Sequence, residues 1–349
     1  MRIGRFASKL AVFICVVFCL ALASSNAASP GVKIVSFDPP GSIFTQPNSV
    51  NVIGQVTGFY DGSTGGAHGF LRERDGTIIS FDPPGSINTI SYGINRIGAT
   101  TGLYHDVCDY GFIRDALGNF TTFDASVGGS GLGTYPVAIN DSGEVVGSSR
   151  DQFSKSHSFL RDRNGNVTIF DPPGFEDTWA TGISPNGEIV GYALEGGFSG
   201  YVRDQAGTIT TFTVPVAQNG TIAGSINRNG QIAGYYYDRN NVAHGFVRDV
   251  DGNFTTFDAP GGGNQNSQGT LASSINDNGE ITGYVISSNN NARGFFRDAS
   301  GTIKLFRAPA AGGGRNQGTF PSGINRSRNM TGLYVDANGV YHGFFGTGF

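Results

Sequence analysis

One fifteen-residue unit recurs along this chain and constrains the fold more than any other feature of the sequence. Its clearest copy, at 244–258, reads HGFVRDVDGNFTTFD, with His first and Asp last. An Asp-Gly pair lies in the middle, and β-branched and aromatic residues flank it, which is typical of two strands joined by a tight turn. The unit therefore predicts a β-hairpin whose first and last residues face each other across the two strands.

The two ends of this hairpin change together from copy to copy. Wherever the first residue is His or Tyr, the residue fourteen positions later is Asp, and where Ser or Arg replaces the His, the Asp is lost too. A His–carboxylate pair that loses one partner leaves a polar group without its hydrogen bond, so joint loss predicts direct contact. The predicted structural pairs are His68–Asp82, His157–Asp171, His244–Asp258 and, between the two ends of the chain, His342–Asp38.

The hairpin is half of a larger repeat with a period of 42 to 49 residues. Before each hairpin stands a Thr, then an Asn six residues later (Ser184 in the fourth copy), then a Gly seven residues after that. This spacing leaves room for two more short strands, and four-stranded antiparallel units at such a period indicate the blades of a β-propeller. Seven copies predict an all-β fold, a seven-bladed β-propeller of four-stranded antiparallel blades.

The two ends of the chain complement each other. Residues 32–38 form an isolated strand of the fourth kind, whereas the last repeat stops after its third strand, at 342–345. We expect the N-terminal strand to complete the last blade and close the ring, within a single domain at 28–349. Residues 1–27 are interpreted as a secretory signal with a basic start and an apolar run too short to span a bilayer. The expected location is therefore secreted, extracellular or periplasmic, without membrane insertion once the signal is removed.

A glycine followed by an aromatic residue marks the third strand, as in His-Gly-Phe at 68–70, 244–246 and 342–344. We expect the glycine to let a neighbouring blade approach closely and the aromatic ring to fill the space between blades. On these residues the sequence resembles the HAF-type extracellular repeat proteins, named for their His-(Ala/Gly)-Phe signature, and it departs from them at 199–201 and 293–295. The resemblance implies secretion and a repeat fold, and it carries no catalytic residues over.

Charge and motif content argue against several classes of function. The chain has a net charge of −4, which becomes −7 without the three basic residues of the signal, and its basic residues are not clustered as a nucleic-acid groove requires. The sequence shows no P-loop, dinucleotide fingerprint, zinc motif or G-x-S-x-G motif. We therefore expect no cofactor, no metal, no nucleic-acid partner and no identifiable catalytic residue.

Loop lengths distinguish the two faces of the predicted ring. The turns within each blade's two hairpins keep a constant length, whereas the loops that lead from one blade to the next span 8 to 13 residues from Phe to Thr. Binding residues commonly lie in loops on a rigid scaffold, so we expect a ligand at this variable face. The candidate ligand-binding residues are Tyr135, Trp179, Asn264, Gln265, Arg315 and Phe320. The structural alternative is that the apolar ones only pack the inner strands.

The favoured function is a binding or interaction module for a glycan or a protein at the cell surface. One alternative is an extracellular propeller enzyme, such as a polysaccharide lyase or hydrolase, and another is a structural envelope or matrix protein. Catalytic sites usually break the symmetry of a repeat with acids and histidines, and acids and histidines outside the repeat pattern do not cluster on the variable face, which favours binding over catalysis.

Overall fold

The computed structural model describes residues 31–127 and 132–349, so the predicted signal at 1–27 and part of the loop at 128–133 lie outside the described residues. Every regular element in these ranges is a β-strand. The strands form antiparallel blades of four, which confirms the all-β prediction and the four-stranded unit. None of the described residues belongs to a helix that could cross a membrane.

Each blade has an inner, a second, a third and an outer strand. The inner strands are β2 (Ser42–Val50), β6 (Asn88–Ile94), β10 (Thr134–Ile139), β14 (Asp177–Ile183), β18 (Thr221–Ile226), β22 (Gly269–Ile275) and β26 (Gly318–Ile324). The second strands are β3 (Val56–Gly62), β7 (Thr100–His105), β11 (Val145–Arg150), β15 (Ile189–Leu194), β19 (Ile232–Tyr237), β23 (Ile281–Ile286) and β27 (Met330–Val335). The third strands are β4 (Ala67–Arg72), β8 (Asp109–Arg114), β12 (Ser156–Arg161), β16 (Phe198–Arg203), β20 (Ala243–Arg248), β24 (Ala292–Arg297) and β28 (Tyr341–Thr347). The outer strands are β5 (Ile78–Phe81), β9 (Phe120–Phe123), β13 (Val167–Phe170), β17 (Ile209–Phe212), β21 (Phe254–Phe257), β25 (Ile303–Phe306) and, from the other end of the chain, β1 (Lys33–Phe37).

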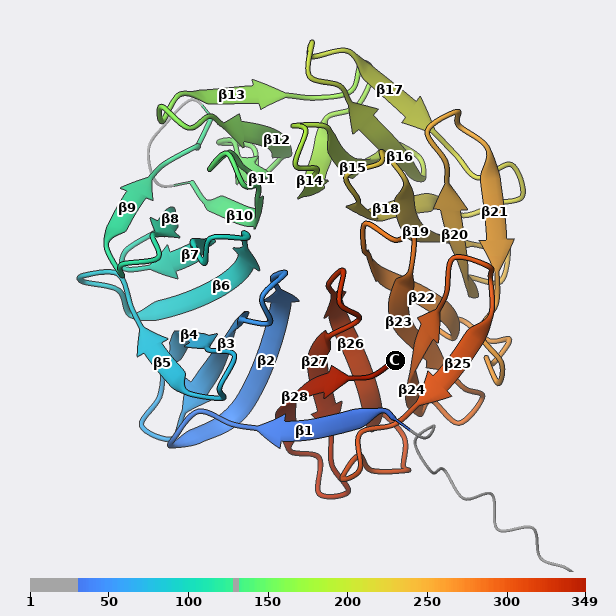
Figure 1. Ribbon diagram of the computed structural model, residues 1–349. Helices are drawn as coiled ribbons and strands as arrows, with labels where there is room; N and C mark the ends of the chain where they lie inside the picture. The colour runs from blue at the N-terminus through green and yellow to red at the C-terminus, as the bar shows by residue number, and fades with distance from the viewer. Residues whose placement is uncertain (1–30, 128–131) are drawn as a thin grey trace, which may run out of the picture.

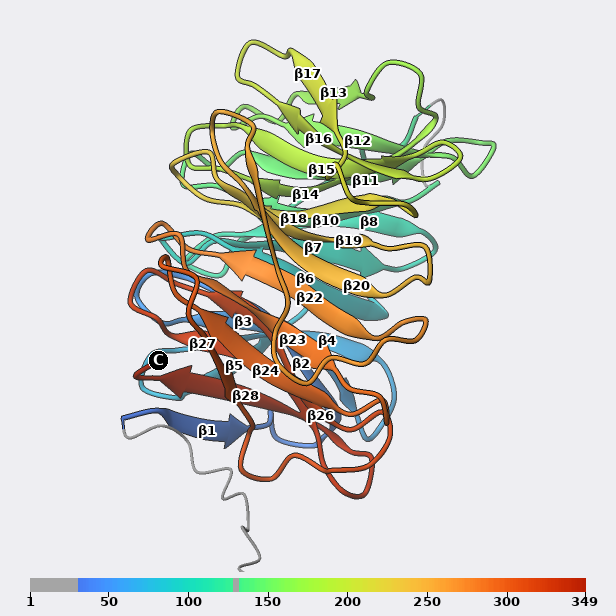
Figure 2. The ribbon, with the colours of Figure 1, turned by 90° about the vertical axis from the view of Figure 1, so that its right-hand side faces the viewer.

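Figure 1 shows the blades arranged around a common centre, with the inner strands toward it and the outer strands on the periphery. The side view in Figure 2 shows the successive blades lying one beside the next. Single parallel bridges join some third strands to the next inner strand, as between Ala292 and Gly318. At the ends of the chain, β1 pairs antiparallel with β28 from Lys33–Thr347 to Phe37–Gly343, and β28 also touches β2.

Aromatic side chains fill the space between neighbouring blades, as predicted. The aromatic residue of each third strand is fully buried and meets the outer-strand ring of the preceding blade edge-on; the centroids of Phe123 and Phe159 are 6.0 Å apart at 71°. The Arg that ends the third strand stacks on the same ring, with Cζ of Arg161 5.1 Å from the centre of Phe123. Cation–π packing of this kind explains why arginines recur at one position of the repeat.

The third-strand glycines make room for the outer strand of their own blade, not for a neighbouring blade as predicted. Within a blade, Gly245 pairs with Phe257 of the outer strand, and a Cβ on Gly245 would lie 2.5 Å from that ring. The expectation that the glycine admits a neighbouring blade is therefore wrong, because the outer-strand ring of the same blade occupies the space that a Cβ would take. The ring then reaches the next blade from this position, since Phe257 packs edge-on against Phe295 at 5.9 Å.

Buried asparagines at the ends of the inner strands link one blade to the next. The Oδ1 atom of Asn325 accepts hydrogen bonds from the N–H groups of Ser327 and Asn329 in its own turn, and its amide donates to a carbonyl of the next blade. Such use of both ends of the side chain accounts for Asn at this position, because a buried amide must be satisfied. The blade-to-blade bonds run from Asn51 to Asn95, Asn95 to Asn140, Asn227 to Asn276, Asn276 to Asn325, and Asn325 to Asn51, over 2.7–3.1 Å.

Candidate functional site

A cavity of about 850 Å³ opens at the variable face, beside the middle of β22, β26 and β2. Its walls come from the blade-to-blade loops at 261–269 and 311–318, from the turn after β23, from the middle of the inner strands, and from the second strands β23 and β27. Among the described residues that line it, Arg315 is the one with a charged side chain. The other polar groups are amides and hydroxyls. This lining and volume suit a small-molecule ligand that is rich in hydrogen-bonding groups.

The two loops that wall the cavity share one conformation. In each, a Gln side chain folds back on its own loop: Gln268 accepts from the N–H of Gln265, and Gln317 accepts from that of Gly314. The amide of each Gln donates to a carbonyl of the adjoining blade turn, at Ser288 and Ala337 respectively. These bonds hold both loops against the blades, so the cavity wall is formed without a ligand.

Backbone hydrogen bonds fix the residue before each of these Gln residues in the same way. The N–H of Ser267 donates to Asn241 and that of Asn316 donates to Asn290, over 3.1 and 2.8 Å. Both Ser267 and Asn316 adopt positive φ values, 65° and 60°. Such values are uncommon for residues with a side chain and persist only where the surrounding structure imposes them. Because the loops superimpose in this way, Asn266 of the first corresponds to Arg315 of the second.

Half-buried aromatic rings supply the apolar part of the cavity. Tyr284 and Phe320 meet edge-on with centroids 5.2 Å apart, and Tyr341, which also lines the cavity, packs against Phe44 with centroids 4.9 Å apart. Burial, followed by the nearby Tyr237, raises the pKa of Tyr284, so its phenol stays protonated at neutral pH. A ring face beside neutral hydroxyl and amide groups can contact the apolar side of a ligand and hydrogen-bond its polar side.

The predicted ligand-binding residues do not all meet. Arg315 and Phe320 share the cavity, whereas Trp179 stacks on Tyr192 in another blade, with centroids 5.1 Å apart. The hydroxyl of Tyr135 donates to Asp109 over 2.9 Å, beside β8. Asn264 and Gln265 bond to each other on the first loop, and Asn264 lines a separate cavity of about 430 Å³.

Sequence reasoning missed several cavity residues, namely Asn266, Asn290, Tyr284 and Tyr341. A signal for Asn266 was available, because the loops at 261–269 and 311–318 are alike in sequence and Asn266 aligns with Arg315. Asn290 and the two tyrosines follow from the fold alone, since they lie on the second and third strands or the turn between them.

The four predicted His–Asp pairs lie in contact at the periphery of the variable face. Nδ1 of each His is 2.7 or 2.8 Å from its carboxylate, including His342 and Asp38 from opposite ends of the chain. At His157 a second carboxylate, Asp151, lies 3.5 Å from Nε2. Burial lowers the pKa of His157, but the two carboxylates outweigh burial and raise it above its ordinary value. No group of three metal-ligating side chains occurs in the described part of the chain.

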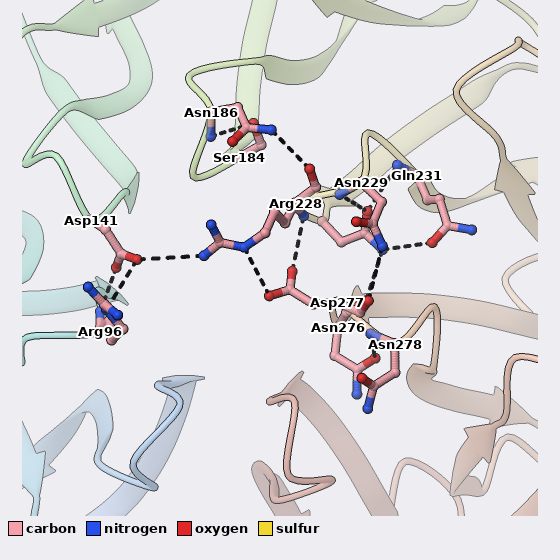
Figure 3. A network of polar contacts seen from close by, with 11 residues as sticks. Arg96, Asp141, Ser184, Asn186, Arg228, Asn229, Gln231, Asn276, Asp277 and Asn278 are labelled. Atoms are coloured by element: carbon pink, nitrogen blue, oxygen red, sulfur yellow. Dashed lines mark hydrogen bonds and ion pairs between the residues drawn. The ribbon is translucent and has the colours of Figure 1, made fainter.

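The opposite end of the inner strands is occupied by ion pairs. Arg228 extends between two carboxylates, 3.5 Å from Asp277 and 4.0 Å from Asp141, and Asp141 also lies 3.6 Å from Arg96 (Figure 3). The cavity at this end is small, about 230 Å³, and is lined by the blade-linking asparagines and their neighbours. The charged groups here mostly engage one another, whereas Arg315 at the variable face has no ion-pair partner among the described residues.

Comparison with known proteins places this geometry on a familiar architecture. No protein-family model matches the chain, and no curated protein matches it in sequence. Among solved structures it resembles a streptogramin B lyase, with a TM-score of 0.58 and 12% identity over 90% of this chain and 97% of the other. A catalytically inactive virginiamycin B lyase from Staphylococcus aureus, with quinupristin, gives the same TM-score and identity over 90% and 99%.

A puromycin hydrolase is also similar in structure, with a TM-score of 0.51 and 16% identity over 88% of this chain and 55% of that protein. At these identities the likeness bears on the fold alone and says nothing about the reaction or the ligand. Together with the four-stranded repeats, it identifies the architecture of this chain as that of a β-propeller.

Proposed function

We propose that this chain is a secreted binding module, a seven-bladed β-propeller closed by β1, which holds a polar ligand in the cavity at its variable face. The contacts between β1 and β28, between Asp38 and His342, and between Asn325 and the Asn51 carbonyl support closure. Secretion through residues 1–27 and the resemblance to HAF-type repeat proteins belong to the same proposal.

The preformed cavity carries the proposal. Its volume of about 850 Å³ lies in the range of small-molecule sites, and its wall combines aromatic rings with amides and one arginine. Aromatic faces beside planar amides match a sugar, which has an apolar ring face and hydroxyls around its edge. A glycan is therefore the favoured ligand, and a protein segment is the alternative.

Among the described residues that line the cavity there is no carboxylate or histidine, the usual general acids and bases, and the ionisable groups are Tyr284, Tyr341 and Arg315. General acid–base chemistry needs a titratable group within hydrogen-bonding reach of the reacting atoms. This observation favours binding over a lyase or hydrolase, and it makes a direct test possible.

The test is a glycan and peptide array with the mature protein, followed by titration of any hit and an assay for its breakdown. Phe320→Ala and Tyr284→Ala should each weaken binding at least about tenfold, since a buried aromatic contact is worth on the order of 1–3 kcal/mol. Phe153→Ala is the matched control, because Phe153 is 75% exposed on a distant blade turn. Full binding by both cavity variants would refute the site, and breakdown of the hit would favour the enzyme.

A further inference from the structure

The blade formed by β22 to β25 reverses the charge found elsewhere at the variable face. At the positions where other blades place the His and its carboxylate, this blade has Arg293 and Arg307. The guanidinium of Arg307 donates to the carbonyls of Ala311 and Gly312, so it lies beneath the loop that carries Arg315. Arg293 lies close enough to Arg307 to act on its charge, and Arg307 contacts the loop whose Arg315 lines the cavity, in a protein whose net charge is negative.

The charge of this group is not neutralised locally. None of Arg293, Arg307 and Arg315 forms an ion pair within the described residues, and the cavity lining contains no carboxylate. Burial, followed by the charge of Arg293, lowers the pKa of Arg307, as expected where positive groups crowd together. Positive charge without a partner beside a concave site attracts an anionic ligand group and favours its entry.

We propose that the cavity takes an acidic saccharide, with Arg315 binding the carboxylate of the sugar and Tyr284 and Phe320 contacting its ring. The inference rests on the binding function proposed above and names its ligand class. Arg315 supplies two parallel N–H donors to a carboxylate. Asn266, at the matching place on the other loop, and Asn290 on the turn between them present amides to the hydroxyls.

The carboxylates of other blades explain why an acidic ligand would bind at this part of the variable face. Around His244 and His342 the corresponding surface carries carboxylates on both sides of the ring, Asp238 with Asp258 and Asp336 with Asp38. Those carboxylates would repel an anionic sugar. The arginine blade is therefore the place on the variable face where attraction and a cavity coincide.

The experiment titrates the mature protein with oligogalacturonate, with the same oligosaccharide as its neutral methyl ester, and with inorganic sulfate, at low and high salt. We expect tighter binding of the acid form, weakened by salt. Arg315→Gln should lower affinity for the acid form about 10- to 100-fold and leave the ester unchanged, because a charge-assisted hydrogen bond is lost. Arg315→Lys should keep part of the preference, and Arg326→Gln, an exposed arginine at the opposite end, should change nothing.

Each other outcome is decisive. Equal binding of acid and ester, with both lost in Phe320→Ala, would overturn the acidic ligand and leave the binding module intact. Competition by sulfate at the same concentration as the sugar would mark a general anion site and overturn the saccharide. Binding of neither oligosaccharide would refute the acidic ligand, whereas binding unaffected by Phe320→Ala would refute the cavity site.

Discussion

Replacing Asn325 with Ala would measure what the blade-linking asparagines contribute. The Asn325 side chain is 4% exposed and makes three hydrogen bonds, two from N–H groups of its own turn and one to the carbonyl of Asn51, 274 residues away. Ser184 is the matched control, because its hydroxyl accepts the same two N–H bonds from Asn186 and Glu188 but has no amide to reach the next blade.

The expected magnitude follows from these bonds. Each lost hydrogen bond costs about 1 kcal/mol, and a buried carbonyl left unsatisfied costs roughly 1–3 kcal/mol. Asn325→Ala should therefore destabilise the protein by about 3–5 kcal/mol, and Ser184→Ala by about 2 kcal/mol. With an unfolding entropy of roughly 0.7 kcal/mol/K for a chain of this size, the melting temperature should fall by about 4–7 °C and about 3 °C respectively.

Differential scanning calorimetry of each variant gives both shifts under one condition. Asn276→Ala, which breaks the same bond between the preceding pair of blades, should behave like Asn325→Ala. Equal shifts for Asn325→Ala and Ser184→Ala would refute the reasoning, because the two positions differ in the blade-to-blade amide. If only Asn276→Ala lowered the melting temperature, the hydrogen bond from Asn325 to Asn51 would not contribute to stability.

Three further perturbations test other parts of the structure. Deleting residues 31–40 removes β1 with its aromatic packing and should lower the melting temperature by roughly 10 °C or more; an unchanged melting temperature would count against closure. Burial lowers the pKa of His157, but two carboxylates outweigh burial and raise it. The charged imidazole therefore stabilises the folded protein fully below about pH 6.5, and this stabilisation is lost as the pH rises through the raised pKa. The difference in melting temperature between the wild type and His157→Gln should thus shrink from pH 5.5 to 8.5, and a constant difference would contradict it. Gly245→Ala should cost about 2 kcal/mol in chemical denaturation by displacing Phe257, whereas Gly197→Ala, with open space around it, should be neutral.

The local unit of this fold could be predicted from the sequence, because a tight turn fixes which residues face each other. His244 and Asp258 are fourteen residues apart on one hairpin, so their joint pattern along the chain reports contact directly. The same holds for the aromatic residues, whose recurrence after a glycine marks a buried position. The outcome for Gly245 shows the limit of this reasoning, since the ring that covers it takes a direction that strand patterns do not specify.

Contacts between repeats were decided by the tertiary structure. The recurring Asn was visible in the sequence, but the carbonyl that its amide reaches lies in the next blade, as between Asn276 and Asn325, and only the placement of the blades identifies it. The candidate site shows this most clearly. Trp179 and Phe320 occupy equivalent places in the repeat, yet one stacks on Tyr192 and the other lines the cavity with Arg315.

Repetition therefore determined the strands, the hairpin pairs and the propeller architecture, because each depends on short sequence separations that recur. The location of the cavity depended on how two long loops fold against the turns of adjoining blades. Those loops are held by hydrogen bonds such as Asn316 to Asn290, across a separation that no turn geometry fixes. The repeated sequence specifies the structure that all blades share. The residues that depart from the repeat form a site only when the blades lie side by side.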